Sequence, residues 1–417
     1  MLHTVTTVTH RSQLLTLLTE ACEIEHGLAC TYLYAAFTLK QELSEGGMTW
    51  QQLQRVRLWA AQIYHVAAQE MLHLAQVWNL QTAIGGTPYY LRPNFPQPSK
   101  YYPLNLPLRL ERFSLATLDR FIQFERPADV IVRSESALSG PGAVPSFRTV
   151  GELYEIIAAA FQAIPDLFIG RPERQVDQAL VDFPDLVPVS SLKTALDAIT
   201  LITKQGEGLD HDRGDCHFGI FRNIRHQYLL ELAQAETTGV AFEPVRMSIS
   251  NPTPSVAPHL TAHGANLILD QNTAEAADCF DSIYSLMLRM LQYVFDNATG
   301  DPQVLKRFAH GSIEAMTTII KPLGEALTRL PAGEDYEAHT AGPAFTLARH
   351  IALPSDPAAA LIVTREKLIE LSARLDNIAA GNPRVQQLRS ASANLGALSR
   401  RFQNPAHAPV AAAVAKP

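Results

Sequence analysis

Cysteine is scarce in this chain, and long apolar runs are absent. Its 417 residues include four cysteines, Cys22, Cys30, Cys216 and Cys279, and none belongs to a Cys-x-x-Cys pair. Such spacing is not that of a disulfide-stapled secreted domain, so we expect free thiols in a reducing cytoplasm. No window of roughly 18 uncharged apolar residues occurs, which predicts no transmembrane helix. The start, MLHTVTTVTHRSQ, has neither the basic segment nor the apolar stretch of a secretory signal.

Positive charge is also in short supply. The net charge is −7, and Lys and Arg are spread along the chain without a basic block. A nucleic-acid partner would require a concentrated basic surface, so this class of function is excluded. Hydrophobic residues make up 47% of the chain. A chain of this length and composition predicts two domains.

Alternation with period two is nearly absent and helical periodicity dominates, which predicts an all-α protein. The first long helix is expected at 11–43. The second is expected at 50–84, between a Thr49 and Gln52 capping box and the pair Gly85 and Gly86. At about 1.5 Å per residue each would be about 50 Å long, as in helix bundles. Further helices are expected from Thr149, from residue 190 or 191 to 206, and at 217–234, 273–297, 302–329, 357–379 and 384–403.

Proline-rich stretches divide these helices. Residues 87–107 contain six prolines and cannot be helical, so they predict a long loop that would suit a substrate gate. Four more prolines mark 243–265 as a linker. The sequence therefore predicts a four-helix bundle at 10–242, a second helical bundle at 266–403 and a disordered tail at 404–417.

Two polar residues interrupt an apolar seam of the second helix. Steps of seven residues lead from Glu70 to Ile63 and Val77, and from His73 to Val66. Both polar side chains therefore lie on the buried face. A buried charge without a partner is costly, so this position requires an explanation.

The first helix repeats the anomaly, because Glu25 lies on the stripe of Leu18, Ala21 and Leu28. Carboxylates brought together repel one another unless a positive charge lies between them, and a metal ion supplies that charge. In helical bundles, a Glu-x-x-His pair binds one ion from a single helix face. Glu25, Glu70 and His73 are therefore candidate ligands, with buried ion or hydrogen-bonded pairs as the alternative.

Later helices offer a second half for such a site. Glu207 extends the apolar face of the helix that ends near residue 206, and His217 begins the stripe of the following helix. Their separation of ten residues fits a site only if the helix is interrupted. Glu207 as an exposed helix end and His217 as a neighbour of a helix cap are the alternatives. For the helix that begins at Thr149 we prefer Glu155 as ligand, because Glu152 is explained by a capping box.

His211, four residues after Glu207, is a substitute for His217. Tyr32, Tyr64 and Tyr154 are expected near the site, although aromatic residues at helical spacing are more often part of the core.

These same segments resemble a known family. The motifs EIEHGLACTYL, EMLHLAQVWNLQTAIGG, TVGELYEII, KQGEG, HFGIF and AGPAF occur in this order. They resemble bacterial ferritin-like proteins related to the iminophenyl-pyruvate dimer synthases of bisindole pigment pathways, over residues 10 to 350. The resemblance implies a ferritin-like bundle with a carboxylate-bridged metal site at Glu25, Glu70, His73, Glu207 and His217. The chain departs from the family where LACTYL replaces a TIPPYL-like turn, so its first helix is expected to be straighter.

The leading hypothesis is a di-iron oxidoreductase that uses O2 and acts on a small amine or imine metabolite. The resemblance points to oxidative coupling of two imines derived from an aromatic amino acid. The competing hypothesis is an iron-binding protein or ferroxidase without an organic substrate. A metal-free scaffold is the third. A homo-oligomer is compatible with each of them.

Overall fold

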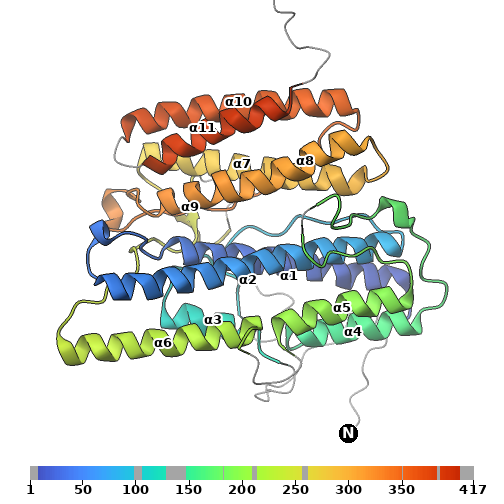
Figure 1. Cartoon of the computed structure of the whole chain (residues 1–417), viewed down its shortest axis with the longest axis horizontal. Coiled ribbons are helices and arrows are strands. Elements are labelled where there is room, and N and C mark those ends of the chain that lie inside the picture. The colour runs from blue at the N-terminus through green and yellow to red at the C-terminus, as the bar shows by residue number, and fades with distance from the viewer. Residues whose placement is uncertain are drawn as a thin grey trace, which may run out of the picture.

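The computed structural model describes residues 8–97, 106–127, 147–181, 183–208, 214–255, 262–349, 351–382 and 386–403. It is an all-α molecule arranged in layers (Figure 1). The long antiparallel pair α1 (Arg11–Phe37) and α2 (Trp50–Ala83) forms the middle of the molecule. The capping box of Thr49 and Gln52 begins α2 as expected. The helix α1 runs through the LACTYL segment without interruption.

The first helix ends six residues before the predicted residue 43. Instead of continuing as a helix, the chain after Phe37 pairs with a distant segment. Leu39 forms an antiparallel bridge with Val245, and the backbone N–H of Lys40 donates to the carbonyl of Pro244 at 2.8 Å. The partner lies about two hundred residues away, so local sequence pattern did not indicate this end.

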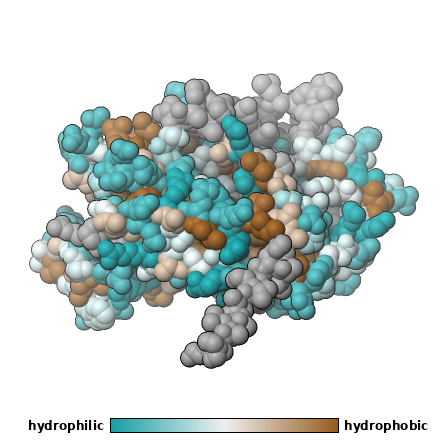
Figure 2. All heavy atoms as spheres, turned by 90° about the horizontal axis from the view of Figure 1, so that it is seen from above, coloured by the Kyte–Doolittle hydropathy of each residue, from teal (hydrophilic) through white to brown (hydrophobic). Residues whose placement is uncertain are grey.

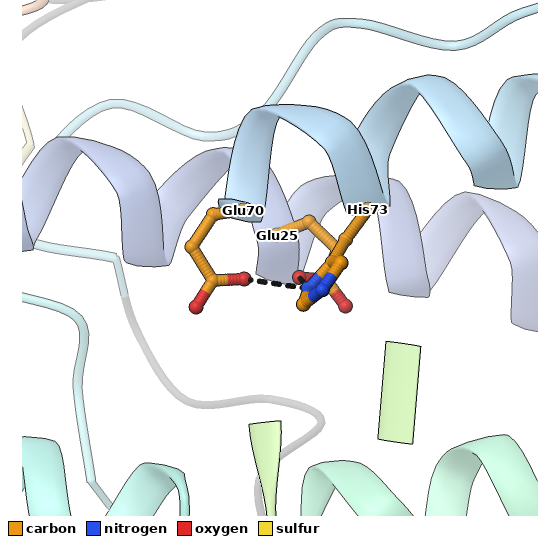
Figure 3. A group of neighbouring side chains, drawn as sticks. All are labelled: Glu25, Glu70 and His73. Carbon is orange, nitrogen blue, oxygen red and sulfur yellow. Dashed lines mark hydrogen bonds and ion pairs between the residues drawn. The ribbon is translucent and has the colours of Figure 1, made fainter. Parts of the chain in front are cut away.

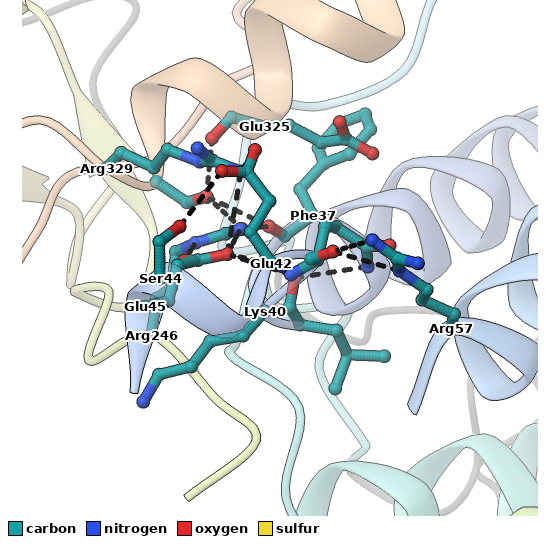
Figure 4. Close-up of polar contacts among 12 residues, drawn as sticks. Phe37, Lys40, Glu42, Ser44, Glu45, Arg57, Arg246, Glu325 and Arg329 are labelled. Carbon is teal, nitrogen blue, oxygen red and sulfur yellow. Dashed lines mark hydrogen bonds and ion pairs between the residues drawn. The ribbon is translucent and has the colours of Figure 1, made fainter. Parts of the chain in front are cut away.

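One arginine joins three parts of the chain at this end of α1 (Figure 4). Arg246 donates to the carboxylate of Glu45 at 2.6 and 2.8 Å, and to the carbonyl of Phe37 at 2.6 Å. The hydroxyl of Thr328 donates to the same Phe37 carbonyl at 2.9 Å. Arg246 is 6% exposed. These charge-assisted hydrogen bonds fix the C-terminal layer against the end of α1.

One layer consists of two pairs of shorter helices. The pair α3 (Leu115–Phe124) and α6 (His217–Thr238) lies beneath one half of α1 and α2. The pair α4 (Val150–Ala163) and α5 (Leu192–Gly206) lies beneath the other half. The prediction placed no helix at 115–124. The four-helix arrangement is thus completed by interrupted helices, whose ends lie near the middle of α1 and α2.

The C-terminal helices form the layer on the other side of α1 and α2 (Figure 1). They are α7 (Gln271–Asp296), α8 (Pro302–Ala315), a π-helical turn (Met316–Ile320), α9 (Lys321–Leu327), α10 (Pro357–Gly381) and α11 (Gln386–Arg401). The π turn ends two residues before Pro322, which has no N–H to donate and so disturbs a regular α-helical ladder. The predicted linker at 243–265 falls between α6 and α7, and the division into two domains stays a prediction.

Minor elements complete the described chain. They are β1 (Pro252–Thr253), β2 (Asn266–Leu267), paired in parallel, and the 3-10 turns Leu43–Glu45, Pro172–Arg174 and Glu334–Tyr336. Residues 98–105 of the proline-rich segment and the tail 404–417 lie outside the described residues, as does His211. The four cysteines are free and buried.

The surface is mixed in polarity. Seen from above, the face of α10 and α11 is largely hydrophilic, with small separate hydrophobic patches (Figure 2). Exposed apolar residues on α10 include Ile362, Val363 and Ile369. Among the described residues, every helix is too short or too polar to traverse a lipid bilayer.

A buried carboxyl in the C-terminal layer gives a test of the fold. Asp281 on α7 is 7% exposed and accepts a hydrogen bond from the backbone N–H of Thr346 at 3.0 Å. Burial disfavours its charged form and raises its pKa to about 8. A carboxyl whose pKa rises on folding stabilises the fold fully below its unfolded pKa of about 3.9. This contribution is lost as the pH increases towards 8.

We therefore expect Asp281→Asn, which keeps the accepting oxygen but cannot ionise, to gain stability relative to the wild type as the pH rises from 4 to 8. Thermal unfolding across this range measures the difference in Tm. Asp376→Asn, a change at an exposed position of α10, is the control and should show no such widening. Parallel Tm curves for Asp281→Asn and the wild type would contradict the assigned pKa.

Candidate metal centre

The middle of α1 and α2 contributes three charged side chains to one point. Glu25 from α1 and Glu70 and His73 from α2 project from the helix pair towards the layer of α4 and α5 (Figure 3). All three are at most 2% exposed. The Nδ1 atom of His73 lies 3.1 Å from Glu70 Oε2 and 3.4 Å from Glu25 Oε2. The buried seam inferred from the sequence is therefore present.

Two helix ends bring a second group to the same point. His217 is the first residue of α6, and Glu125 directly follows the last residue of α3. The Nδ1 atom of His217 lies 3.0 Å from Glu70 Oε1 and 3.5 Å from Glu125 Oε2. The rings of His73 and His217 stack with centroids 5.4 Å apart. The interruption before α6 thus brings His217 into the bundle centre.

The five residues form two half-sites that share one carboxylate. Glu25, Glu70 and His73 can hold one metal ion, and Glu70, Glu125 and His217 can hold another, because the ligand atoms of each group lie within 4.8 Å of one another. Glu70 directs one carboxylate oxygen to each histidine. Glu70 could therefore contribute one oxygen to each of two half-sites.

Tyrosine hydroxyls support the two outer carboxylates. The hydroxyl of Tyr154 on α4 donates to Glu25 Oε1, and that of Tyr32 on α1 donates to Glu125 Oε1. In both carboxylates the second oxygen, Oε2, faces a histidine. Each outer glutamate is therefore fixed in orientation with one oxygen directed to the centre. Tyr64, also expected here, instead donates to Glu325 at 2.6 Å.

Two glutamines fix the histidine rings. The Nε2 atom of His73 lies 2.9 Å from Gln205 Oε1, and that of His217 lies 3.1 Å from Gln69 Oε1. Each amide oxygen requires a proton on Nε2 and leaves Nδ1 directed at the carboxylates. An outer hydrogen bond of this kind is the usual way in which a metal-binding histidine is oriented.

The electrostatics of the cluster demand positive charge. Burial and the charge of Glu70 raise the pKa of Glu25 to about 7. Burial opposes protonation of the histidines, but the neighbouring carboxylates raise the pKa of His73 to about 10 and that of His217 to about 9. Without a cation, protons must therefore balance the carboxylates. Divalent cations bound at Nδ1 and the carboxylate oxygens would replace those protons, so the donor set fits metal ions.

Glu207, at the end of α5, lies beside the cluster but outside the two groups. It lines a small cavity together with Glu25, Glu70, His73 and Glu125. Gly151 makes room for it, because a Cβ atom there would lie 1.6 Å from Glu207 Oε1. Glu207 can therefore lie near the centre because Gly151 on α4 has no side chain and leaves space for its carboxylate.

The preferred third-helix residue is not brought to the cluster. Glu155 is exposed on α4, whereas its neighbour Tyr154 is buried and contacts Glu25. Glu152 lies in the first turn of α4, where its backbone N–H donates to the hydroxyl of Thr149 and its carboxylate pairs with Arg148. The inward position of this helix therefore carries a phenol and not a carboxylate.

Glu125 was missed by the sequence analysis. It lies four residues after Phe121 and seven after Leu118, on the apolar stripe of α3. The rule that identified Glu25, a carboxylate on an apolar stripe, would have found it.

The chain is similar to several known proteins. A ferritin-like family profile matches residues 18–226. Dichlorochromopyrrolate synthase from Lentzea aerocolonigenes is 27% identical over 82% of this chain and 36% of its own length. The 2-imino-3-(indol-3-yl)propanoate dimerase from Chromobacterium violaceum is 26% identical over 80% of this chain and 34% of its own length. The chain spans about a third of the length of these two relatives.

A solved structure of a ferritin-like protein from Caulobacter vibrioides has 18% identity and a TM-score of 0.49, over 74% of this chain and 95% of that chain. The matched profile covers half of the chain, from within α1 to the first turns of α6, and includes all five clustered residues. The chain belongs to the ferritin-like family.

Proposed function

We propose that this protein is a non-haem oxidoreductase with two metal ions, which we take to be iron. Glu25, Glu70, His73, Glu125 and His217 would hold them. The observation that carries the proposal is the pair of half-sites joined by Glu70. Their nitrogen and oxygen donors suit iron, manganese or zinc, and redox chemistry favours iron among these. With Glu207, four carboxylates would balance two divalent cations.

Two bound irons would supply the redox chemistry, with O2 as the oxidant. The chain's own residues would prepare the site for it. Gln205 and Gln69 keep the proton of each imidazole on Nε2, and the tyrosines keep the outer carboxylates turned inward. Because the cluster is almost fully buried, bulk water is kept from reactive species.

For the substrate we propose a small imine or amine that carries an aromatic group. Support comes from the names of the two relatives, a chromopyrrolate synthase and an indolyl-imine dimerase. Joining two such imines through one carbon–carbon bond removes two protons and two electrons. One O2 accepts them as hydrogen peroxide, so the reaction balances. Because this chain corresponds to a third of each relative, coupling activity is proposed for it and does not follow from the likeness.

Iron handling without an organic substrate is the second candidate. A bundle that only oxidises or stores iron does not need the additional layer of α7–α11 over α1 and α2. The presence of that layer favours an enzymatic function over iron handling alone. Assembly into a large hollow oligomer, measured by size-exclusion chromatography with light scattering, would instead favour iron storage.

We expect wild-type protein purified without chelator to contain close to two irons per chain. His73→Ala and His217→Ala each remove the nitrogen ligand of one half-site, so each should lose at least one iron. Elemental analysis by mass spectrometry measures the content. His226→Ala, an exposed histidine of α6, is the matched control and should retain both irons. A folded wild type without metal would refute the proposed centre.

The proposed participation of Glu207 predicts an effect of Gly151→Ala. The added methyl group would collide with the carboxylate and displace it, so we expect at least a tenfold loss of iron affinity in competition titrations with a chelator. Gly396→Ala on α11 is the control. Its Cβ would meet only Ser372 Oγ at 3.5 Å, which is ordinary contact, so its affinity should not change. Unchanged affinity in Gly151→Ala would assign Glu207 a structural role.

The proposed reaction predicts substrate-dependent oxygen consumption. Iron-loaded protein given indole-3-pyruvate and ammonium, which form the imine in solution, should consume O2 and yield a product with the mass of a coupled dimer. Glu70→Gln removes the shared negative charge and should reduce the rate at least a hundredfold. An oxygen electrode and mass spectrometry give the two measurements. Iron-loaded wild type that consumes O2 equally with and without the imine would contradict the coupling reaction.

A further inference from the structure

A large cavity lies between α1 and α2 and the C-terminal layer. Its volume is about 490 Å³, within the range of roughly 300–1,000 Å³ typical of small-molecule sites. Side chains from α1, α2, α5, α7, α8, the π turn, α9 and the loop at 183–185 line it. We refer to it as the interlayer chamber. It is separate from the small cavity that adjoins Glu207.

The inner wall of the interlayer chamber is apolar and aromatic. Its buried residues are Ala29, Phe37, Ala67, Leu72, Tyr284, Met287 and Ile320. Its charged residues lie towards solvent, because His65 and Asp185 are exposed and Lys321 is partly exposed. An apolar ligand is therefore favoured, because its apolar surface is removed from water when it enters the chamber.

Tyr284 is held with its hydroxyl turned towards the core. This hydroxyl lies 2.6 Å from His26 Nε2 and 3.2 Å from Cys30 Sγ. The Nδ1 atom of His26 lies 2.8 Å from the carbonyl of Tyr90 and donates to it, so Nε2 accepts from the tyrosine. The hydroxyl is thus bound within the protein. The ring of Tyr284 lines the chamber. A flat aromatic ligand can stack on such a ring.

The polar end of the chamber adjoins the candidate metal centre. Gln69 and Gln205 line the chamber, and they are the two residues whose amide oxygens contact Nε2 of His217 and His73. Within the described residues, the NH2 groups of these amides make no hydrogen bond that would compete with a ligand. A molecule in the chamber would therefore lie one hydrogen bond away from both histidines.

We propose that the interlayer chamber binds a flat aromatic molecule, with its ring against Tyr284 and Phe37 and its polar end at Gln69 and Gln205. This inference rests on the proposed function and deepens it, because it gives the substrate class a site. The chamber wall contains the π turn at Met316–Ile320, and such turns are frequent at functional sites. The substrate would approach the two-metal centre from the side of Gln69 on α2 and Gln205 on α5.

The test uses indole-3-propionate, which has the ring and carboxylate but no imine to react. Isothermal titration calorimetry on the full chain, with and without iron, should detect binding. Ala68 is exposed on α2 and lines the chamber, so Ala68→Phe should obstruct it and weaken binding at least tenfold. Ala61→Phe changes an exposed alanine of the same helix outside the chamber and should leave binding unchanged. 3-Cyclohexylpropionate, which is not flat, should bind at least tenfold more weakly than the indole compound.

The outcomes separate the two proposals. Equal binding to Ala68→Phe and the wild type, with iron content and Tm unchanged, would overturn the chamber, as would equal loss in Ala61→Phe. Equal affinity for the cyclohexyl compound would overturn the flat aromatic class. Iron-loaded protein that couples imines but does not bind indole-3-propionate would leave the proposed function standing and refute the chamber. Wild-type protein that takes up no iron but binds the indole compound would leave the chamber standing and refute the proposed function.

Discussion

The shared position of Glu70 between two histidines is the constraint on which the rest of the structure depends. Three carboxylates in the middle of a helical bundle repel one another and lose their hydration, so they are stable only when positive charge lies between them. The two imidazoles supply that positive charge when they are protonated. Metal ions bound at the same nitrogens would replace the protons and supply the charge instead. The surrounding hydrogen bonds from tyrosines and glutamines orient the ligands in either case.

The interrupted layer follows from this constraint. Glu207 and His217 are ten residues apart, so a continuous helix could not direct both to one point in adjacent turns. The structure instead ends α3 and α5 and begins α4 and α6 near the centre. Two helix C-termini and two N-termini meet there, so their end dipoles largely offset one another. The charge of the carboxylates is left for protons or ions to balance.

Periodicity predicted the parts of the site that lie on long helices. Glu25, Glu70 and His73 follow from apolar stripes of many turns, and the all-α fold follows from the same pattern. Tyr154 was expected near the site and lies there. Glu125 was not predicted because it lies at the end of a ten-residue helix, where few turns define a buried face. The early end of α1 depends on Val245 and Arg246, which only the folded chain brings near. Local pattern therefore specifies helix faces well, but it specifies a helix end only where a local cap marks it, as Thr49 does for α2.

The central helix pair separates the carboxylate cluster from the interlayer chamber, and adjacent residues of each helix contribute to opposite sides. On α2, Gln69 lines the interlayer chamber while Glu70 joins the carboxylate cluster; on α1, His26 supports Tyr284 while Glu25 joins the cluster. Successive helical residues point about 100° apart, so each helix can serve both sides within a single turn. Iron storage needs only the cluster side. An apolar chamber on the opposite side, coupled to the same histidines, is the arrangement expected when an organic molecule exchanges electrons with the centre.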